Sequence, residues 1–270
     1  MKFGSRYGIA GVIPEPGLDL GARSSIFPDV DIRYTIADKS LWAHAVVTGG
    51  NDLNPYSRMI DDCPIVLPTS TMDFGSRPLD ATFSIESVIG GRLGINLETN
   101  YKIYRNKMIF VPAFDGSALT QMTAAYRDVN QFSLQAEAFW RSQDVTVGGR
   151  LRYADYRNSG TKDVVTEMPA WTGYGFVRYN FRERIIAQVE CNYRSKTSGD
   201  MVDMLPGGIG LTAAVPAYEV PAIVDMDLNV NYLINKHFSV FAKVGNLLGH
   251  RNQYMPLYLE PGRNFGGGFC

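Results

Sequence analysis

The chain has 270 residues, and its 26 lysines and arginines nearly balance its 27 aspartates and glutamates, which leaves a formal net charge of −1. This balance excludes the broad basic surface with which proteins bind nucleic acid. Aromatic residues make up 12% of the chain and glycine occurs 27 times, a mixture that suits strands and turns better than helices. No run of about 18 apolar residues occurs, so no transmembrane helix is predicted, whereas a membrane β-barrel needs no such run.

The N-terminal third predicts strands joined by short turns. Residues 1–16 are weakly patterned, with a possible strand at Tyr7–Val12 and none of the apolar core of a signal peptide. From Leu18 to Ile36 the even positions are apolar, although Pro28 interrupts the run and favours an edge strand or a bulge. A turn at 37–39 leads to a strand at 41–47, and residues 49–76 are predicted to form a long loop.

The middle of the chain repeats the same alternation. Strands are predicted around 79–86 and 93–103, on either side of a turn at 90–92. After a loop near 112–119, another hairpin follows with its turn at 142–144 and a loop at 158–166. A further hairpin turns at 182–183, and a long loop is predicted at 196–218.

The clearest hairpin lies at 224–248. Its first strand has apolar residues at the even positions from Val224 to Ile234, with two aspartates and two asparagines between them. A strict period of two predicts a strand with one apolar and one polar face. A tight turn at 235–236 and a second alternating strand follow, then a loop at 249–261 and a final strand ending at Cys270.

Two regularities predict the fold class. About eleven or twelve strands are expected, and their connections alternate strictly between short turns and long loops, as in up-and-down outer-membrane barrels. We therefore predict an all-β, antiparallel, up-and-down transmembrane β-barrel that forms one domain over residues 1–270. A dry core inside so many strands would be too wide to fill, so the polar face should line a wet lumen and the apolar face should meet lipid.

Charged residues on the polar face are the candidates for contact with a solute. They alternate with apolar residues along neighbouring strands, and the arginines among them would attract an anion unless cross-strand partners such as Glu137 neutralise them. The predicted lumen-facing residues are Arg150, Arg152, Arg178, Glu190, Arg194, Asp225, Asp227 and Lys243.

The C-terminal end carries a resemblance to a known family. The segments Val244–Gly249 and Pro256–Cys270 contain an Asn-Leu pair that closes a strand, then a Pro-Gly-Arg sequence and an aromatic that lead into the last strand. This order resembles the end of TonB-dependent outer-membrane receptors. The resemblance implies structural roles for Asn246, Gly262, Arg263 and Phe265, which would fix the closing strands.

The family is known for 22-stranded barrels that enclose a plug domain. The resemblance therefore implies uptake of a scarce nutrient, such as a metal chelate, a vitamin or a glycan, across the outer membrane of a Gram-negative bacterium. Its partners would be outer-membrane lipid, the barrel-assembly machinery, a plug domain and the TonB energy-coupling complex. Because no plug pattern and only about half of the family's strands are found, we expect a fragment that holds the C-terminal half of a receptor barrel.

Other functions have weaker support. A small passive porin of about twelve strands and a β-sheet binding protein outside membranes stay open as alternatives. No enzyme is expected, because no motif surrounds His44, His237 or His250. No metal site and no cofactor is expected. His44 has no histidine partner nearby, and adjacent acidic residues in a loop, such as Asp61 and Asp62, are usually only hydrated. The cysteines Cys63, Cys191 and Cys270 are expected to be unpaired, with Cys63 reactive in its loop and Cys191 shielded on the lipid face.

Overall fold

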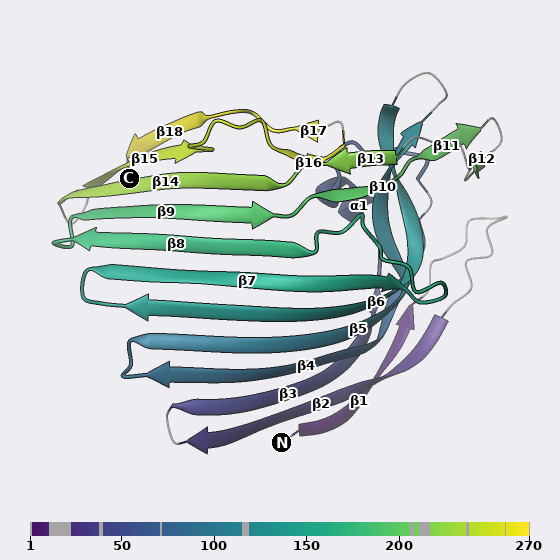
Figure 1. Ribbon diagram of the computed structural model, residues 1–270, viewed down its shortest axis with the longest axis horizontal. Helices are drawn as coiled ribbons and strands as arrows, with labels where there is room; N and C mark the ends of the chain where they lie inside the picture. Colours follow the sequence, from purple (N-terminus) through teal and green to yellow (C-terminus); the bar gives the residue numbers. More distant parts are fainter. Residues whose placement is uncertain are drawn as a thin grey trace.

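One large antiparallel sheet dominates the fold, and strands that follow one another in the chain lie side by side (Figure 1). The computed structural model describes residues 2–10, 23–37, 40–70, 72–114, 119–205, 208–210, 217–235, 238–256 and 258–269. The strands on the main path are β1 (Lys2–Ala10), β2 (Arg23–Ala37), β3 (Leu41–Asp52), β4 (Gly75–Ile89), β5 (Leu93–Phe114), β6 (Leu119–Arg141), β7 (Val145–Asn158), β8 (Trp171–Phe181), β9 (Ile185–Arg194), β14 (Ile223–Asn235), β15 (Phe238–Gly245) and β18 (Asn264–Phe269).

The long connections hold further short elements, which corrects the prediction of plain loops. The expected loop at 49–76 begins later, because β3 continues to Asp52, and it contains a helix. The expected loop at 196–218 contains four short strands. These elements are α1 (Tyr56–Asp62), β10 (Thr197–Asp200), β11 (Val202–Leu205), β12 (Gly208–Gly210), β13 (Ala217–Val220), β16 (Gln253–Met255) and β17 (Tyr258–Leu259). Among the described residues no helix is long and apolar enough to cross a membrane.

The N-terminal strand begins earlier than the sequence suggests. It was expected at Tyr7–Val12, whereas β1 covers Lys2–Ala10 and pairs with β2 along its whole length. Residues 11 and 12 of the expected strand, the turn residues 38 and 39, residue 236 of the turn at 235–236, and Cys270 lie outside the described residues.

Two of the short turns show why they reverse the chain so tightly. Gly90 and Gly91 have φ values of 59° and 67°, and the amide of Arg92 donates to the carbonyl of Ile89 at 3.1 Å. Positive φ at both central residues marks the hairpin turn whose twist matches the flanking strands. Arg182 and Glu183 adopt the same conformation without glycine, with φ values of 52° and 57°. In Figure 1 these turns gather at the left end of the sheet, and the long connections lie at the right end.

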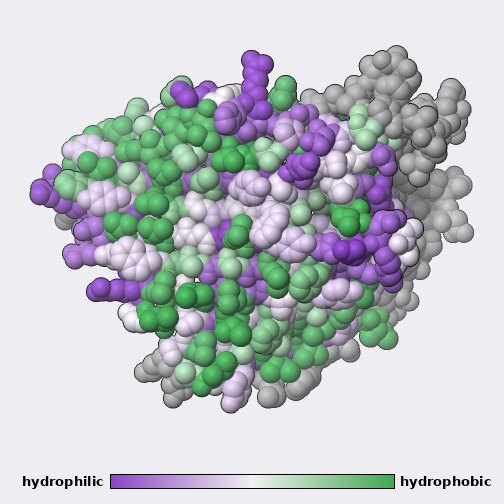
Figure 2. All heavy atoms as spheres, in the orientation of Figure 1, coloured by the Kyte–Doolittle hydropathy of each residue, from purple (hydrophilic) through white to green (hydrophobic). Residues whose placement is uncertain are grey.

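The two faces of the sheet differ as the alternation predicts. Polar side chains from one face are buried, including Asp80, Gln131 and Ser133. Large apolar side chains from the other face are exposed. Figure 2 shows apolar residues spread over the strands, with hydrophilic ones at the left edge, at the top and toward the right. A soluble sandwich would show the reverse burial. Exposed members of the apolar face include Tyr34, Phe83, Leu97, Leu134, Trp140, Leu151, Val177, Tyr179, Val224 and Tyr232.

A bulge in β5 reverses the alternation where the sheet leaves its regular part. The pairing with β6 shifts between Tyr104 and Lys107, so one strand gains a residue and its faces are exchanged beyond that point. Above the bulge, β5 and β6 carry a buried apolar cluster on each face. One cluster consists of Ile109, Val111, Val129, Ala154, Tyr156 and Val165. The other consists of Met59, Cys63, Val66, Met122 and Ala124.

Cys63 is therefore not the reactive loop thiol that the sequence predicts. Its side chain is fully buried, since residues 64–67 run beside β6 and α1 covers the other side. Burial also raises the pKa of the Cys63 thiol, and the nearby Asp62 adds to the rise. Cys63 and Cys191 are both free thiols.

Glycine and phenylalanine alternate across four neighbouring strands near the short turns. The register places Gly94 of β5 beside Phe139 of β6, and Gly148 of β7 beside Phe176 of β8. A Cβ atom on Gly94 would lie 2.1 Å from the Phe139 ring, and one on Gly148 would lie 2.5 Å from the Phe176 ring. Each ring thus occupies the space beside a glycine, so this level of the polar face is filled by uncharged side chains.

The sheet is curved but open. Within the described ranges β1 pairs only with β2, and β18 pairs only with β15, so the two outer strands do not close a barrel (Figure 1). The predicted all-β, antiparallel, up-and-down fold is confirmed, and the open edges agree with a part of a larger barrel.

Candidate functional site

Side chains of the polar face meet in rows across β7, β8, β9 and β14. In one row Arg150 lies beside Tyr174, which lies beside Asn192, which in turn lies beside Asp225. The next row toward the long connections contains Arg152, Thr172 and Arg194. The register therefore brings three of the predicted arginines to one corner of the sheet.

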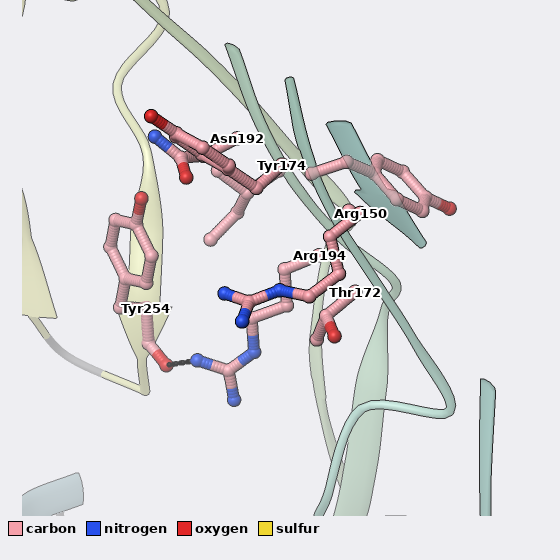
Figure 3. A pocket seen from close by; sticks show the side chains of 9 residues that line it. Arg150, Thr172, Tyr174, Asn192, Arg194 and Tyr254 are labelled. Carbon is pink, nitrogen blue, oxygen red and sulfur yellow. Dashed lines mark hydrogen bonds between the residues drawn. The ribbon is translucent and has the colours of Figure 1, made fainter. Parts of the chain in front are cut away.

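A pocket of about 270 Å³ opens at this corner. Its polar lining includes Arg150 of β7, Tyr174 of β8, and Asn192 and Arg194 of β9. Tyr254 of β16 forms the opposite wall, so the pocket lies between the sheet and the connection that follows β15 (Figure 3). Of the eight predicted lumen-facing residues, only Arg150 and Arg194 line this pocket. The other six are Arg152, Arg178, Glu190, Asp225, Asp227 and Lys243.

Two guanidinium groups point into the pocket from β7 and β9, the strands on either side of β8. Figure 3 shows those of Arg150 and Arg194 directed toward the segment that carries Tyr254. The Nη1 atom of Arg194 donates to the main-chain oxygen of Tyr254 at 3.1 Å, while its Nε atom is buried without a partner. No ion pair found among the described residues involves either arginine. These two cations, without an ion-pair partner among the described residues, give the pocket a positive charge that favours an anion over a cation.

A second cavity of about 280 Å³ adjoins the first and shares Arg194 and Tyr254 with it. Its lining comes from β5, β6, β9, β10, β13, β16 and the connection before β8. It is rich in sulfur, because Met108, Met122 and Met255 face it together with Met168 of that connection. The adjoining cavities thus combine a basic corner with an apolar, sulfur-rich one.

Acidic groups also lie close to the basic pocket, since Asp225 pairs in register with Asn192 of the lining. Asp227 accepts a hydrogen bond of 2.9 Å from the main-chain amide of Asn246. Burial raises the pKa of Glu260, and the negative charges of Asp225 and Asp227 raise it further. Burial, followed by the charge of Glu260, also raises the pKa of Tyr254. The acidic residues around Tyr254 thus favour bound protons there and disfavour an anion.

The remaining predicted lumen residues lie nearer the short turns. Glu190 accepts a hydrogen bond of 2.7 Å from Gln188, and Lys243 pairs in register with Asn229. Arg178 lies opposite Gln188. They are spread along the same face and do not converge on the pocket.

The residues implied by the family resemblance surround the last two strands. Asn246 has φ 51° and donates from its side-chain amide to the carbonyl of His250. Arg263 donates from Nη2 to the carbonyl of Leu247 at 2.8 Å. Gly262 has no neighbour near the position of a Cβ, and Phe265 is 75% exposed on the outermost strand. Their structural role stays a prediction.

The other residues weighed in the sequence make local contacts. His44 Nε2 lies 2.9 Å from Asp31 Oδ1, and Asp62 forms an ion pair with Arg58 one turn earlier in α1. In the part of the chain that the structure describes, no group of three or more histidines, cysteines, aspartates or glutamates is arranged to hold a metal.

Sequence reasoning missed Tyr254 and the methionines of the second cavity. Tyr254 belongs to a connection without periodic pattern, so nothing in the sequence places it opposite β9. The methionines were not singled out because each one fits an ordinary apolar position in its own segment. Only the folded chain brings Met108, Met122 and Met255 to one cavity.

Comparison with known proteins gives the fold but not a sequence family. No family model matches the chain, and no curated protein matches it significantly. Solved structures do match: the copper transporter OprC is 14% identical with a TM-score of 0.62, over 92% of this chain and 40% of that one. The ferric enterobactin receptor PfeA from Pseudomonas aeruginosa is 14% identical with a TM-score of 0.63, over 91% of this chain and 40% of that one.

A third match extends the comparison to another genus. The FrpB iron transporter from Neisseria meningitidis is 11% identical with a TM-score of 0.61, over 92% of this chain and 38% of that one. At such identities the likeness shows the fold alone, which is that of a part of a TonB-dependent receptor barrel, as the C-terminal resemblance predicts. The chain spans about two fifths of the length of these proteins.

Proposed function

We propose that this chain forms part of the barrel wall of an outer-membrane receptor that takes up a scarce nutrient, and that its basic pocket contacts an anionic form of that nutrient. The observation that carries the proposal is the inverted burial of the sheet. Polar residues such as Asp80 and Gln131 are buried on one face, whereas Leu97 and Leu151 on the other are about half exposed. Such a sheet suits lipid outside and water inside.

The connections support the orientation of this wall. Outer-membrane barrels carry short turns on the periplasmic side and long connections outside the cell. The basic pocket lies at the end with the long connections, between Arg194 at the end of β9 and Tyr254. A solute arriving from outside would therefore meet the pocket before the rest of the polar face.

The class of nutrient follows from the charge of the pocket and from the proteins that share the fold. Arg150 and Arg194 favour an anion. The matched proteins are named as a copper transporter, an iron transporter and a ferric enterobactin receptor. We therefore favour a metal carried in an anionic chelate over a glycan. In the complete protein we expect a plug domain and the energy-coupling complex as partners.

The proposal is tested with outer membranes from cells that make the protein in its natural full length. The chain should sediment with the outer-membrane fraction and bind a radiolabelled anionic ferric catecholate. Replacing Arg150 or Arg194 with Gln should weaken binding about tenfold, since one charge-assisted hydrogen bond is lost in each case. The matched control is Arg178→Gln, which removes the same charge from the same face outside the pocket.

Two results would overturn the proposal. One is recovery of the chain outside the outer membrane. The other is equal affinity of the wild type and of the Arg150→Gln, Arg194→Gln double variant for every anionic chelate tested.

A further inference from the structure

The second cavity, next to the basic pocket, has a wall made mainly of apolar side chains from segments that lie far apart in the sequence. Arg194 and Tyr254 line both cavities, so the two meet at these residues. Methionine is unbranched and flexible, so a wall rich in methionine adapts to the shape of an apolar group. The apolar lining of the second cavity consists of Met108, Ile109, Phe110, Met122, Met168, Pro169, Met255 and Pro256.

The charges around the second cavity disfavour a cation and leave its apolar wall free for an uncharged group. Lys107 and Arg194 line it, and its acidic residue, Glu167, forms an ion pair of 2.7 Å with Arg127. The Lys107 ammonium lies 3.9 Å from the centre of the Tyr104 ring. A cation over an aromatic ring is partly stabilised there, and the carbon stem of a lysine offers further apolar surface.

Arg194 stands where the two cavities meet. Its Nη1 atom donates to the main-chain oxygen of Tyr254 at 3.1 Å, and its Nε atom is buried without a partner. The guanidinium of Arg150 is directed toward the same segment (Figure 3). An anionic group held by these two arginines would therefore have the apolar cavity beside it.

The sizes of the cavities also favour a shared ligand. Their volumes are about 270 and 280 Å³, each just below the range of roughly 300–1,000 Å³ that is typical of small-molecule sites. The two together fall within that range. Such sites combine an apolar wall with a few polar groups that fix the orientation of the ligand, which is the division of roles between these cavities.

We propose that the two cavities form one site for an amphiphilic anion, whose oxyanion group contacts Arg150 and Arg194 and whose aliphatic arm lies in the apolar cavity. An alkyl chain is as flexible as the methionines around it, so it can follow a wall built from several segments. The inference rests on the proposed function, because it takes the basic pocket as the part that meets the anionic nutrient. It narrows the class of that nutrient to chelates that carry an alkyl or acyl arm.

Such a site separates two contributions to affinity. The arginines hold the anionic group whatever the length of the arm, so loss of Arg150 should weaken short and long ligands by the same factor. Each methylene that enters the apolar cavity should strengthen binding by about threefold to fourfold. Affinity should therefore rise with chain length, and this rise should depend on the apolar wall and not on Arg150.

The experiment titrates the full-length protein, purified from outer membranes, with acetate, butanoate, hexanoate and octanoate. Saturation-transfer difference NMR measures each affinity in one detergent, so that partition into micelles is the same for every variant. One test variant carries Met168→Gln and Met255→Gln, which keep side-chain length and make the wall polar. Met108→Gln on β5 is a second test variant that leaves the connections unchanged. The control carries Met72→Gln and Met201→Gln, which lie outside both linings.

Wild type and control should gain about threefold or more per methylene, and both test variants should gain less than about twofold while binding acetate like wild type. Arg150→Gln should bind all four acids about tenfold more weakly and keep the gain per methylene. Equal affinity of wild type for acetate and octanoate would overturn the inference, and so would an undiminished gain in both test variants.

The same experiment distinguishes this inference from the proposed function. Absence of the chain-length dependence, with ferric catecholate binding that still requires Arg150, would remove this inference alone. Chain-length dependence in a protein that is recovered outside the outer membrane would remove the proposed transport role alone.

Discussion

Val66 lies beside Met122 in a parallel β-bridge, although one belongs to the connection before β4 and the other to the extension of β6. Two main-chain hydrogen bonds, from Leu67 to Met122 at 2.7 Å and from Met122 to Ile65 at 3.1 Å, fix the two segments together. The connection is therefore attached to β6 at residues 65–67, and the side chains between α1 and β6 are buried.

The first prediction concerns Cys63, which this attachment buries. A water-soluble maleimide should label Cys63 slowly in intact membranes, because the thiol is enclosed and mostly protonated. Met122→Ala should speed the labelling, because it opens a cavity next to the thiol. Mass spectrometry of the modified peptide measures the rate, and Met226→Ala serves as the control. Fast labelling of Cys63 in the wild type would contradict the enclosed position.

The second prediction concerns the apolar face. Leu228→Arg lies near the middle of β14 on that face and should lower the free energy of unfolding by about 2–4 kcal/mol in lipid. Asn229→Arg, one residue further on the polar face, should cost far less. Urea unfolding of the membrane-embedded protein measures both. Similar costs at the two positions would show that the apolar face does not meet hydrocarbon.

The third prediction separates the two arginines of the pocket. Arg150→Met and Arg194→Met each remove one positive charge, so both should weaken binding of an anion. Only Arg194 holds the main chain at Tyr254, so only Arg194→Met should make residues 250–256 accessible to protease. Limited trypsin digestion, read at the exposed Arg251, distinguishes the variants. Equal protection in both would assign no anchoring role to Arg194.

The fourth prediction is a pH dependence of the same connection. Burial and the charges of Asp225 and Asp227 raise the pKa of Glu260 when the connection is closed. Below the ordinary pKa of 4.5, Glu260 is protonated and the connection packs against the sheet without the cost of burying a charge. As the pH rises through the raised pKa, Glu260 becomes charged and the packed state of the connection loses stability relative to the detached state. Opening, followed by hydrogen exchange of residues 250–262, should therefore increase with pH. Glu260→Gln should remove the dependence, and a dependence that survives in this variant would point to another group.

The fifth prediction concerns the outer strands β1 and β18, which do not pair with each other in the described sheet. Backbone groups without partners are not tolerated in hydrocarbon, so an open sheet cannot stand alone in a bilayer. The isolated 270-residue chain should refold poorly in detergent and give no compact form that shifts on heating in gel electrophoresis. Clean two-state refolding into a protease-resistant monomer would support the small-porin alternative.

The regular part of the sheet was predictable because alternate residues of a strand point to opposite faces, so a period of two in the sequence shows that one face is apolar and the other polar. The strand β14 follows the alternation from Val224 to Ile234, and both of its aspartates pair in register with polar residues of β9, Asp225 with Asn192 and Asp227 with Glu190. The contrast between short turns and long connections was equally visible. These signals are local, since each depends on neighbouring residues within one segment.

The features that the sequence did not predict depend on contacts between segments far apart in the chain. The bulge between Tyr104 and Lys107 exchanges the faces of β5, and a run of polar residues gives no sign of it. The helix α1 carries apolar residues at helical spacing, Tyr56, Met59, Ile60 and Cys63, but the pattern is only two turns long and lies in a segment rich in turn residues. Packing of Met59 against Met122 and Ala124 of β6 fixes the helix. Tyr254 reaches the pocket only because the connection after β15 folds back to Arg194.

The hairpin of β5 and β6 is far longer than a membrane requires. These strands have 22 and 23 residues, whereas about 9–11 residues cross the hydrocarbon of a bilayer. The excess length, past the bulge in β5, still forms paired strands, and it carries Met108 and Met122 and supports the connection with α1. A ligand that binds there meets groups already ordered during folding, so little conformational entropy is lost on binding and selection by shape becomes possible outside the membrane.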